Sequence, residues 1–436
     1  MIATARVAAF DALREIEARH LDLGEAVARV RKPLADERDR ALLLELVSGT
    51  LRMRAAIDFQ LASRVIRSLS KLDEAVRIIL RMSGFQLLYL SRIPASAVIN
   101  DAVELTRRSG KSSAAGLVNA VLRALARDRE KLTWPAVPPP DAAVGPVAEY
   151  LAVVHSHPAW LVARWVERHG RDAAERWLEF NNHAAALCLA PNRTLVSRDA
   201  LAEELLADGV ETRPTSRAPH GLHVVSGQPL ATRAFREGRF LVQDEASQLI
   251  AALVDPPRGS RVLDLCASPG GKTMSLVADV GGQGLVVASD VRPHRLRVLA
   301  STLARCCASR ARVIQVPAEG PLPLRDESVD AVLIDAPCSG LGTVRRDPDI
   351  RWRRSPEDLP RFAAAQLNLL DRACGLVRPG GTLIYSTCSS EPDENEDVVA
   401  AFLRTHANYS QVRTHQTLPF RDGLEAFYGA VLRRTL

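Results

Sequence analysis

The chain has 436 residues, a length typical of two or three domains. Hydrophobic residues make up 47% of it and charged residues 25%, so its composition is globular and excludes a collagen-like, disordered or membrane-spanning chain. Charged side chains run through the first twenty residues, and the seven cysteines follow no disulfide spacing. We therefore expect a reduced, cytoplasmic protein without a signal peptide.

The net charge of +6 is concentrated near the N-terminus. Residues 1–140 hold 23 basic and 16 acidic side chains, residues 141–239 hold 11 and 12, and residues 240–436 hold 23 of each. A basic module beside a neutral one favours a polyanionic partner such as nucleic acid. A solvated basic surface would give the same counts, and charge alone does not separate the two interpretations.

The first 239 residues divide into three predicted parts. Apolar residues recur at spacings of three and four through residues 1–132, which predicts a helical domain. Five of the fifteen residues 133–147 are proline, which is typical of a stiff linker, and we expect a domain boundary there. Residues 148–239 read as a small mixed α/β subdomain, with helices at 159–180 and 198–207 and short strands at 187–190 and 222–225.

From residue 240 onward short apolar runs alternate with helical segments. The runs are at 261–266, 285–290, 312–316, 329–335 and 381–387. This alternation predicts an α/β domain with a parallel, doubly wound sheet. Ligands of such sheets bind at the carboxyl ends of the strands, so residues at those ends are the candidates for function.

The first of these strands runs into a glycine-containing loop, CASPGGKT (266–273), that precedes a helix. A phosphate loop would need glycine at position 266, which is Cys266, and Pro269 removes a backbone N–H from the cradle. Asp290, at the end of the second strand, is suited to bind ribose hydroxyls. Asp264 would orient the loop or bind a ligand ammonium, or it would only cap the glycine turn. A nucleoside site without a phosphate cradle favours S-adenosylmethionine, with Lys272, one of only five lysines, in the loop.

Two cysteines follow two further strands. Cys338 lies in DAPCSG (335–340) and Cys388 in STCS (386–389), where a nucleophilic thiolate would be well placed. No CxxC or HxxxH pair accompanies them, which disfavours a metal site, and a disulfide is disfavoured in a reducing compartment. We interpret four other cysteines as small buried hydrophobic residues: Cys188, Cys306, Cys307 and Cys374.

One thiolate, one carboxylate and a sulfonium methyl donor suffice for a specific reaction. Carbon 5 of cytosine becomes nucleophilic once a thiolate adds to carbon 6, and it can then accept a methyl group. An acid near N3 and N4 of the base would favour the addition, and Asp335 is placed for that contact.

A basic segment follows the first of these cysteines, RRDPDIRWRR (345–354). Arginine forks and a stacking indole are typical of contact with single-stranded RNA, although a solvated loop could have the same composition. The residues that we predict to bind RNA are Arg345, Arg346, Arg351, Trp352 and Arg353.

The motifs DLCASPGGKT (264–273), DAPCSG (335–340), RRDPDIRW (345–352) and STCS (386–389) together resemble the RNA cytosine-C5 methyltransferases of the RsmB (Sun/Fmu) type. FLVQDEASQL (240–249) fits the same pattern, and the helical N-terminal third is similar to the NusB-like RNA-binding domain of those enzymes. The resemblance implies an all-helical NusB-like domain followed by a Rossmann-like methyltransferase domain.

The resemblance also implies roles for individual residues. Cys388 would be the nucleophile, Cys338 would assist product release, and Asp335 would contact both the base and the methyl-donor region. Where the family usually has Asp-Gly after the third strand, this chain has Glu319-Gly320, and Glu319 would substitute for the aspartate. The expected S-adenosylmethionine contacts are Cys266, Ala267, Ser268, Pro269, Gly270, Gly271, Lys272, Asp290, Glu319 and Asp335. Near the C-terminus, 422–428 departs from the family's Asp-Gly-Phe-Phe, which we interpret as a short insertion.

The leading hypothesis is an S-adenosylmethionine-dependent enzyme that forms 5-methylcytosine in 16S rRNA, unassembled or partly assembled, through a covalent cysteine adduct. We expect a monomer that needs neither a metal nor a membrane. The alternatives are the same chemistry on tRNA or large-subunit rRNA, and a non-catalytic NusB-like RNA-binding or antitermination factor.

Overall fold

The computed structural model describes residues 2–18, 21–66 and 68–435, and these form two compact units. Unit 1 comprises residues up to Ala184 together with Val344–Arg354, and unit 2 comprises Ala185–Thr343 and the residues from Ser355 onward. The proline-rich stretch 133–147 lies inside unit 1. Residues 148–184 are largely helical and lie in unit 1, and residues 185–239 lie in unit 2.

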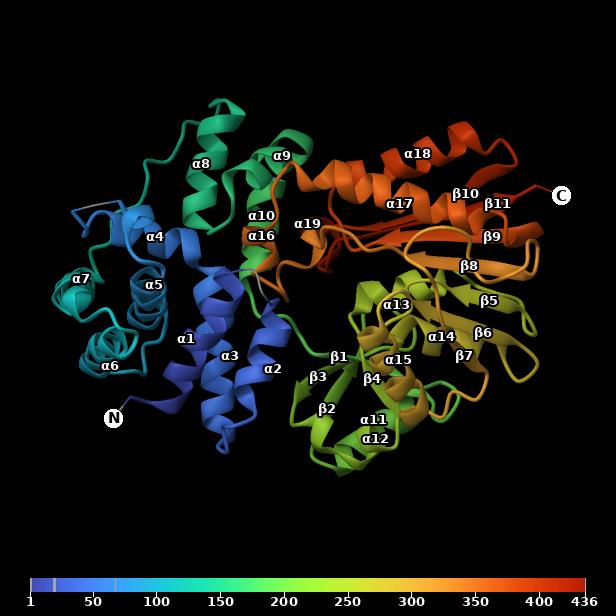
Figure 1. The fold of residues 1–436 in the computed structure, drawn as a ribbon, viewed down its shortest axis with the longest axis horizontal. Coiled ribbons are helices and arrows are strands. Elements are labelled where there is room, and N and C mark those ends of the chain that lie inside the picture. The colour runs from blue at the N-terminus through green and yellow to red at the C-terminus, as the bar shows by residue number, and fades with distance from the viewer. Residues whose placement is uncertain (1, 19–20, 67, 436) are drawn as a thin grey trace. The chain divides into compact units, whose positions relative to one another are not determined.

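Unit 1 is helical in its described part, as the spacing of apolar residues predicts (Figure 1). One hydrophobic core joins the helices of the first 130 residues, and it includes the fully buried Leu43, Leu46 and Leu122. The predicted helix at 159–180 is two helices, because Gly170 adopts a positive φ of 79° and separates them. The helices are α1 Thr4–Glu17, α2 Leu23–Arg31, α3 Glu37–Arg52, α4 Arg54–Ala62, α5 Glu74–Tyr89, α6 Ala95–Arg108, α7 Ala115–Asp128, α8 Val144–Val154, α9 Ala159–His169, α10 Arg171–Asn182 and α16 Ile350–Arg353.

Unit 2 contains two sheets. The smaller has the order β2-β3-β1-β4 and is antiparallel throughout. Strands β1 and β3 lie close to the predicted runs, whereas β2 has no apolar run and β4 consists of only three residues, Phe-Leu-Val. The strands are β1 Cys188–Pro191, β2 Glu211–Pro214, β3 Leu222–Ser226 and β4 Phe240–Val242, with helices α11 Arg198–Ala207 and α12 Arg233–Arg236.

The larger sheet has seven strands within the described residues, in the order β10-β11-β9-β8-β5-β6-β7. The five strands from β9 to β7 are parallel, as predicted, but β11 pairs antiparallel with both β9 and β10. The sheet is therefore mixed rather than wholly parallel. Its strands are β5 Arg261–Asp264, β6 Leu285–Asp290, β7 Ala311–Gln315, β8 Val329–Asp335, β9 Val377–Thr387, β10 Tyr409–Thr417 and β11 Phe427–Arg434.

Helices cover both faces of this sheet. Figure 1 shows α17 and α18 on one face and α13, α14 and α15 on the other. Alternate strand residues point to opposite faces, so that Leu263 and Ile334 contact one layer and Val262 and Leu333 the other. The helices are α13 Glu245–Ala252, α14 Gly271–Val280, α15 Pro293–Arg305, α17 Asp358–Cys374, α18 Glu396–Thr405 and α19 Pro419–Asp422.

This arrangement brings the carboxyl ends of five parallel strands to one edge of the sheet. The chain leaves unit 2 after Thr343, a few residues beyond the end of β8, and returns at Ser355. Within residues 2–18, 21–66 and 68–435, we find no helix with the length and apolar character needed to cross a membrane.

Candidate active site

The glycine-containing loop lies between β5 and α14. Gly270 has a φ of 110°, a conformation that side chains disfavour, and a Cβ there would lie 3.1 Å from Leu299 Cδ1. Helix α14 begins at the next residue, so its first backbone N–H groups face the loop. The loop therefore has the tight backbone and open helix end that a small ligand can approach closely.

Asp264 sits at the base of this loop, fully buried at the end of β5. Its Oδ2 accepts a hydrogen bond from Thr273 Oγ1 at 2.7 Å, which is the expected cap on the glycine turn. Its Oδ1 has no hydrogen-bond partner among the described residues. Burial raises the pKa of Asp264 to about 7. One oxygen thus supports the loop while the other remains available, which fits a cationic group of a bound ligand.

Two acidic residues follow the next strands. Asp290, at the end of β6, is 6% exposed, and its Oδ1 accepts a hydrogen bond from the backbone N–H of Arg292 at 3.0 Å. Glu319 lies in the exposed turn after β7, and Arg372 fixes that turn by donating to the carbonyl oxygens of residues 317, 318 and 320. Both carboxylates therefore belong to strand ends on the edge that carries the glycine loop, where a nucleoside would be bound.

Cys338 and Cys388 come together at the ends of β8 and β9. These strands are parallel neighbours in which Asp335 pairs with Ser386, so the segments that follow start side by side. The two Sγ atoms are 3.2 Å apart. The hydrogen bond with Cys388, together with burial, raises the pKa of Cys338 well above the usual range of a thiol. The pair therefore keeps a proton on Cys338.

Lys272, in the first turn of α14 directly after the glycine turn, contacts Asp335 at the end of β8. Its Nζ donates to Asp335 Oδ2 at 2.7 Å and to Ser247 Oγ at 2.8 Å. Burial opposes the charge on this ammonium, but the charge of Asp335 and the hydrogen bond to it outweigh burial and raise the pKa of Lys272. The other carboxylate oxygen of Asp335 accepts from Ser386 Oγ at 3.1 Å. Lys272 thus holds the carboxylate beside the cysteines.

Sequence reasoning missed several residues of this edge. Gln243 packs against Gly271, and its Nε2 donates to Ser247 Oγ at 3.2 Å, which links it to Lys272. Glu394, buried behind the cysteine segments, was also overlooked. The motif FLVQDEASQL (240–249) contains both Gln243 and Ser247 and is a signal for them. Nothing in the local sequence singles out Glu394.

The other cysteines differ in exposure. Cys188 and Cys306 are buried, as expected of small hydrophobic residues, and Cys374 is half-buried. The interpretation of Cys307 as buried is wrong: it is exposed, because it follows the end of α15 with a positive φ of 54°. Burial raises the pKa of Cys266, which disfavours a thiolate in the glycine loop.

The basic segment 345–354 is packed within unit 1, and the prediction that Arg351 contacts RNA is wrong. Arg351 is fully buried and donates to the carbonyl oxygens of Ser156 at 3.0 Å and Val344 at 3.2 Å. A side chain used in this way has no donor left at the surface. Trp352 is half-buried, and its Nε1 donates to the carbonyl oxygen of Leu51 at 2.6 Å.

The other arginines of this segment are half-buried. Arg345 donates to the carbonyl oxygen of Ala184 at 2.7 Å, and Arg353 forms an ion pair with Asp349 at 3.1 Å. RNA contact by Arg345, Arg346, Trp352 and Arg353 stays a prediction.

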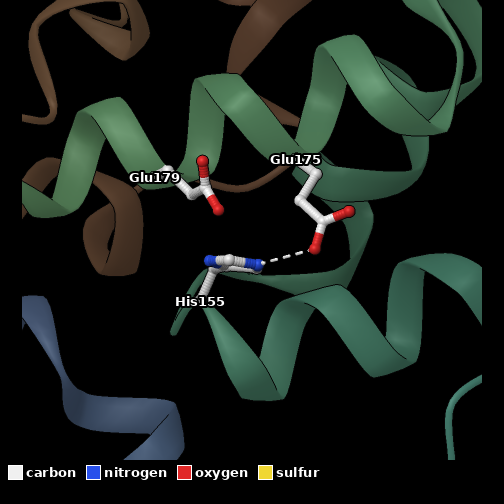
Figure 2. Close-up of side chains that lie close together, drawn as sticks. All are labelled: His155, Glu175 and Glu179. Carbon is white, nitrogen blue, oxygen red and sulfur yellow. Dashed lines mark hydrogen bonds and ion pairs between the residues drawn. The ribbon is translucent and has the colours of Figure 1, made fainter.

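One group of three potential metal ligands comes together in the described part of the chain. Figure 2 shows His155 facing Glu175 and Glu179, which both extend from α10. The His155 ring lies 3.4 Å from a Glu175 oxygen, as in an ordinary hydrogen bond or ion pair. The group includes neither Cys338 nor Cys388, and because proximity alone defines no site, we assign no metal to it.

Comparison with known families divides the chain into three matched regions. Residues 3–127 match the NusB family, residues 157–231 match the RsmF/B-like ferredoxin-like domain, and residues 251–432 match the 16S rRNA methyltransferase RsmB/F model. The NusB match precedes the methyltransferase match along the chain, in the order that the resemblance implies.

Relatives and solved structures agree with this division. A probable ribosomal RNA small subunit methyltransferase B of Bacillus subtilis is 34% identical, over 86% of this chain and 82% of its own. The ribosomal RNA small subunit methyltransferase B of an Escherichia coli strain is 32% identical, over 94% and 95%. The crystal structure of PH0851 shares the fold, with a TM-score of 0.83, 24% identity and coverage of 100% and 99%. The chain belongs to the RsmB/F family of methyltransferases.

Proposed function

We propose that this protein is an S-adenosylmethionine-dependent methyltransferase that forms 5-methylcytosine in 16S rRNA through a covalent bond between Cys388 and carbon 6 of the base. The observation that carries the proposal is the pair of thiols 3.2 Å apart, beside a carboxylate held by a buried lysine. The family membership and the names of the relatives support ribosomal RNA of the small subunit as the substrate.

The residues of the glycine loop, together with Asp290 and Glu319, would hold the cofactor. The unpartnered, buried Oδ1 of Asp264 fits a cationic ligand, and the tight turn at Gly270 fits close approach to backbone. When bound, S-adenosylmethionine supplies a methyl group on a sulfonium centre. The chain then has to provide the nucleophile, the acid and the path for the proton.

The raised pKa of Cys338 supports the division of labour between the two cysteines. With its proton on Cys338, the pair leaves Cys388 as the sulfur that adds to carbon 6. The ammonium of Lys272 is close enough for its charge to interact with Cys388 and holds Asp335 toward the base. Asp335 would contact N3 and N4 of the base, and as the addition proceeds it would pass to N3 a proton taken from the Lys272 ammonium.

Product release follows from the same pair. Once Cys388 is bonded to carbon 6, its sulfur is no longer a thiolate that accepts the Cys338 hydrogen bond and repels charge on Cys338, so the main cause of the raised pKa of Cys338 is removed. Cys338 can then release its own proton to solvent and accept the one on carbon 5. The electron pair of that C–H bond restores the ring double bond, and Cys388 leaves as a thiolate.

Variants of the two cysteines test the proposal. Cys388→Ala should abolish methyl transfer to small-subunit RNA, whereas Cys338→Ala should accumulate a protein–RNA adduct that survives denaturing electrophoresis. Bisulfite sequencing of ribosomal RNA from cells with and without the gene would identify the nucleotide. Methyl transfer by the Cys388 variant would disprove the assignment, and failure of the wild type to bind S-adenosylmethionine would favour a non-catalytic RNA-binding role.

A further inference from the structure

Both cysteine segments rest on one buried acidic side chain. Glu394 ends the short turn Pro392–Glu394 before α18 and is fully buried. Its Oε1 accepts from the backbone N–H of Ser339 at 2.8 Å, and its Oε2 accepts from Ser339 Oγ and from Ser389 Oγ, each at 2.5 Å. Ser339 follows Cys338 directly and Ser389 follows Cys388 directly, so one side chain contacts both segments next to the reactive sulfurs.

A fourth donor completes the coordination of this carboxylate. Gln366, a fully buried residue of α17, donates from Nε2 to Glu394 Oε1 and to the carbonyl oxygen of Pro337, both at 3.0 Å. Four donors saturate the acceptor capacity of an ionised carboxylate, which is how a charge can be buried without a cation. The segment before Cys338 is therefore tied to the same group as the segment after it.

The backbone of Glu394 is fixed as well. Tyr385, buried in β9, donates its hydroxyl to the carbonyl oxygen of Glu394 at 2.5 Å, and the N–H of Glu394 donates to the carbonyl oxygen of Glu391 at 3.1 Å. The side chain thus extends from a turn whose backbone is anchored to β9. Movement of either cysteine segment relative to the other would break at least one of the bonds to Glu394.

We infer that Glu394 is a positioning residue that holds Cys338 and Cys388 at the separation needed for their two consecutive steps. The inference rests on the proposed function for its kinetic part, since the roles of the cysteines come from there. The geometric part, that Glu394 sets the distance between the two sulfurs, holds whatever the substrate is. The negative charge of Glu394 also contributes to the raised pKa of Cys338, after the effects of Cys388 and burial.

A thiol-oxidation assay on the whole protein tests the geometric part without RNA or cofactor. Diamide, an azo compound, takes two electrons and two protons from a pair of thiols, becoming a hydrazine while an S–S bond forms. The Cys338 and Cys388 sulfurs, 3.2 Å apart, need to approach by only about 1.2 Å to reach the length of a disulfide. The rate at which the linked 338–388 peptide appears in mass spectra therefore reports how well the two segments are held together.

Three substitutions of Glu394 separate its geometry from its charge. Glu394→Ala should slow disulfide formation at least about tenfold. Glu394→Asp should slow it less, because it keeps a carboxylate, although that group is withdrawn by one methylene. Glu394→Gln should stay within about threefold of the wild type, because an amide of the same shape can donate to the two serine hydroxyls and accept from the other donors. Formation of the disulfide at the wild-type rate in a folded Glu394→Ala protein would overturn the inference.

Glu245 provides a matched control. It is also a buried glutamate in unit 2 that accepts four hydrogen bonds, from Ser216 Oγ, His223 Nε2 and the backbone N–H groups of residues 217 and 218. Glu245→Ala should lower the melting temperature about as much as Glu394→Ala yet leave the rate of disulfide formation unchanged. An equal slowing in both variants would mean that loss of stability, and not positioning, explains the effect.

A double-mutant cycle and a kinetic measurement complete the test. Replacing both Ser339 and Ser389 by alanine should slow disulfide formation as Glu394→Ala does, and combining all three changes should add little. In methyl-transfer assays, Glu394→Ala should lower kcat about 100-fold, as misplacement by about 1 Å can do, with KM for S-adenosylmethionine within twofold. If the wild type transfers no methyl group, the proposed function fails while the oxidation assay still decides the role of Glu394.

Discussion

Lys272 in unit 2 and Arg351 in unit 1 are two cations with little or no exposure, and their partners differ. In unit 2, the ammonium of Lys272 meets the carboxylate of Asp335 at 2.7 Å, and this pairing raises the pKa of Lys272 despite burial. In unit 1, the guanidinium of Arg351 meets neutral groups, among them the carbonyl oxygens of Ser156 and Val344. Burial, with a contribution from the charge of Arg52, lowers the pKa of Arg351 to about 9.

This difference separates a functional charge from a structural one. The side chain of Asp335 is 31% exposed. A cation paired with such a carboxylate can influence a ligand that contacts the exposed part of the carboxylate. A cation surrounded by carbonyl oxygens has all its interactions inside the fold, so its effects are confined to folding. Substitution of Lys272 should therefore affect the reaction most, whereas substitution of Arg351 should affect folding most.

The largest effect is expected for Lys272→Met. The substitution keeps the length of the side chain but removes the cationic partner of the Asp335 carboxylate, which is 31% exposed and can be solvated, so the loss falls on the reaction more than on folding. We expect the single-turnover rate of methyl transfer to small-subunit RNA to fall about 1000-fold, with a smaller change in melting temperature. A rate within tenfold of the wild type would show that Asp335 does not need this cation.

Arg351→Met should have the converse effect. It leaves the acceptors of Ser156 and Val344 without their donor inside unit 1, which should lower the free energy of unfolding by about 2 kcal/mol in urea titrations. RNA affinity measured against salt concentration should keep its slope, because a buried guanidinium neutralises no phosphate. A slope reduced by about one with unchanged stability would instead return Arg351 to the RNA-binding surface.

The sequence predicts the positions of the strand ends in unit 2 well, because strands and glycine turns are encoded by neighbouring residues. The runs at 285–290 and 329–335 coincide with β6 and β8, and the segments bearing Cys338 and Cys388 follow neighbouring strands. β9 begins earlier than predicted, at Val377, since its first residues include Pro379 and two glycines, which hide a strand from a propensity argument.

Contacts between distant parts of the sequence could not be predicted in this way. Arg351 looks like its arginine neighbours until the carbonyl oxygen of Ser156, 195 positions away, is placed beside it. Glu394 meets Ser339 across 55 positions, and Lys272 meets Asp335 across 63. The unusual scarcity of lysine drew attention to Lys272, but only the fold assigns it a partner.

Asp264 extends the comparison to a buried carboxyl group whose Oδ1 has no hydrogen-bond partner among the described residues. Burial raises its pKa from 3.8 to about 7, so between these values the folded protein binds more protons than the unfolded chain. Stability from this group is thus present below about pH 4 and is lost as pH rises toward 7, by at most about 1.4 kcal/mol per pH unit. The melting temperature of Asp264→Asn should therefore rise relative to that of the wild type as pH increases from 4 to 8. A difference between the two melting temperatures that stays constant with pH would contradict the raised pKa.

The smallest effect concerns the proton that Asp264 holds near neutral pH. If the free Oδ1 receives a cationic group of S-adenosylmethionine, binding should favour the carboxylate and release the proton, about half of one at pH 7, where a group with a pKa of about 7 is half protonated. Calorimetric titrations in phosphate and in Tris should then give different binding enthalpies, because the two buffers take up a proton with different heats. Asp264→Asn should abolish the difference while its amide oxygen still accepts from Thr273, so the loop keeps its cap. Equal enthalpies for the wild type in both buffers would mean that the cationic group binds away from Asp264 and that this carboxyl serves the glycine turn alone.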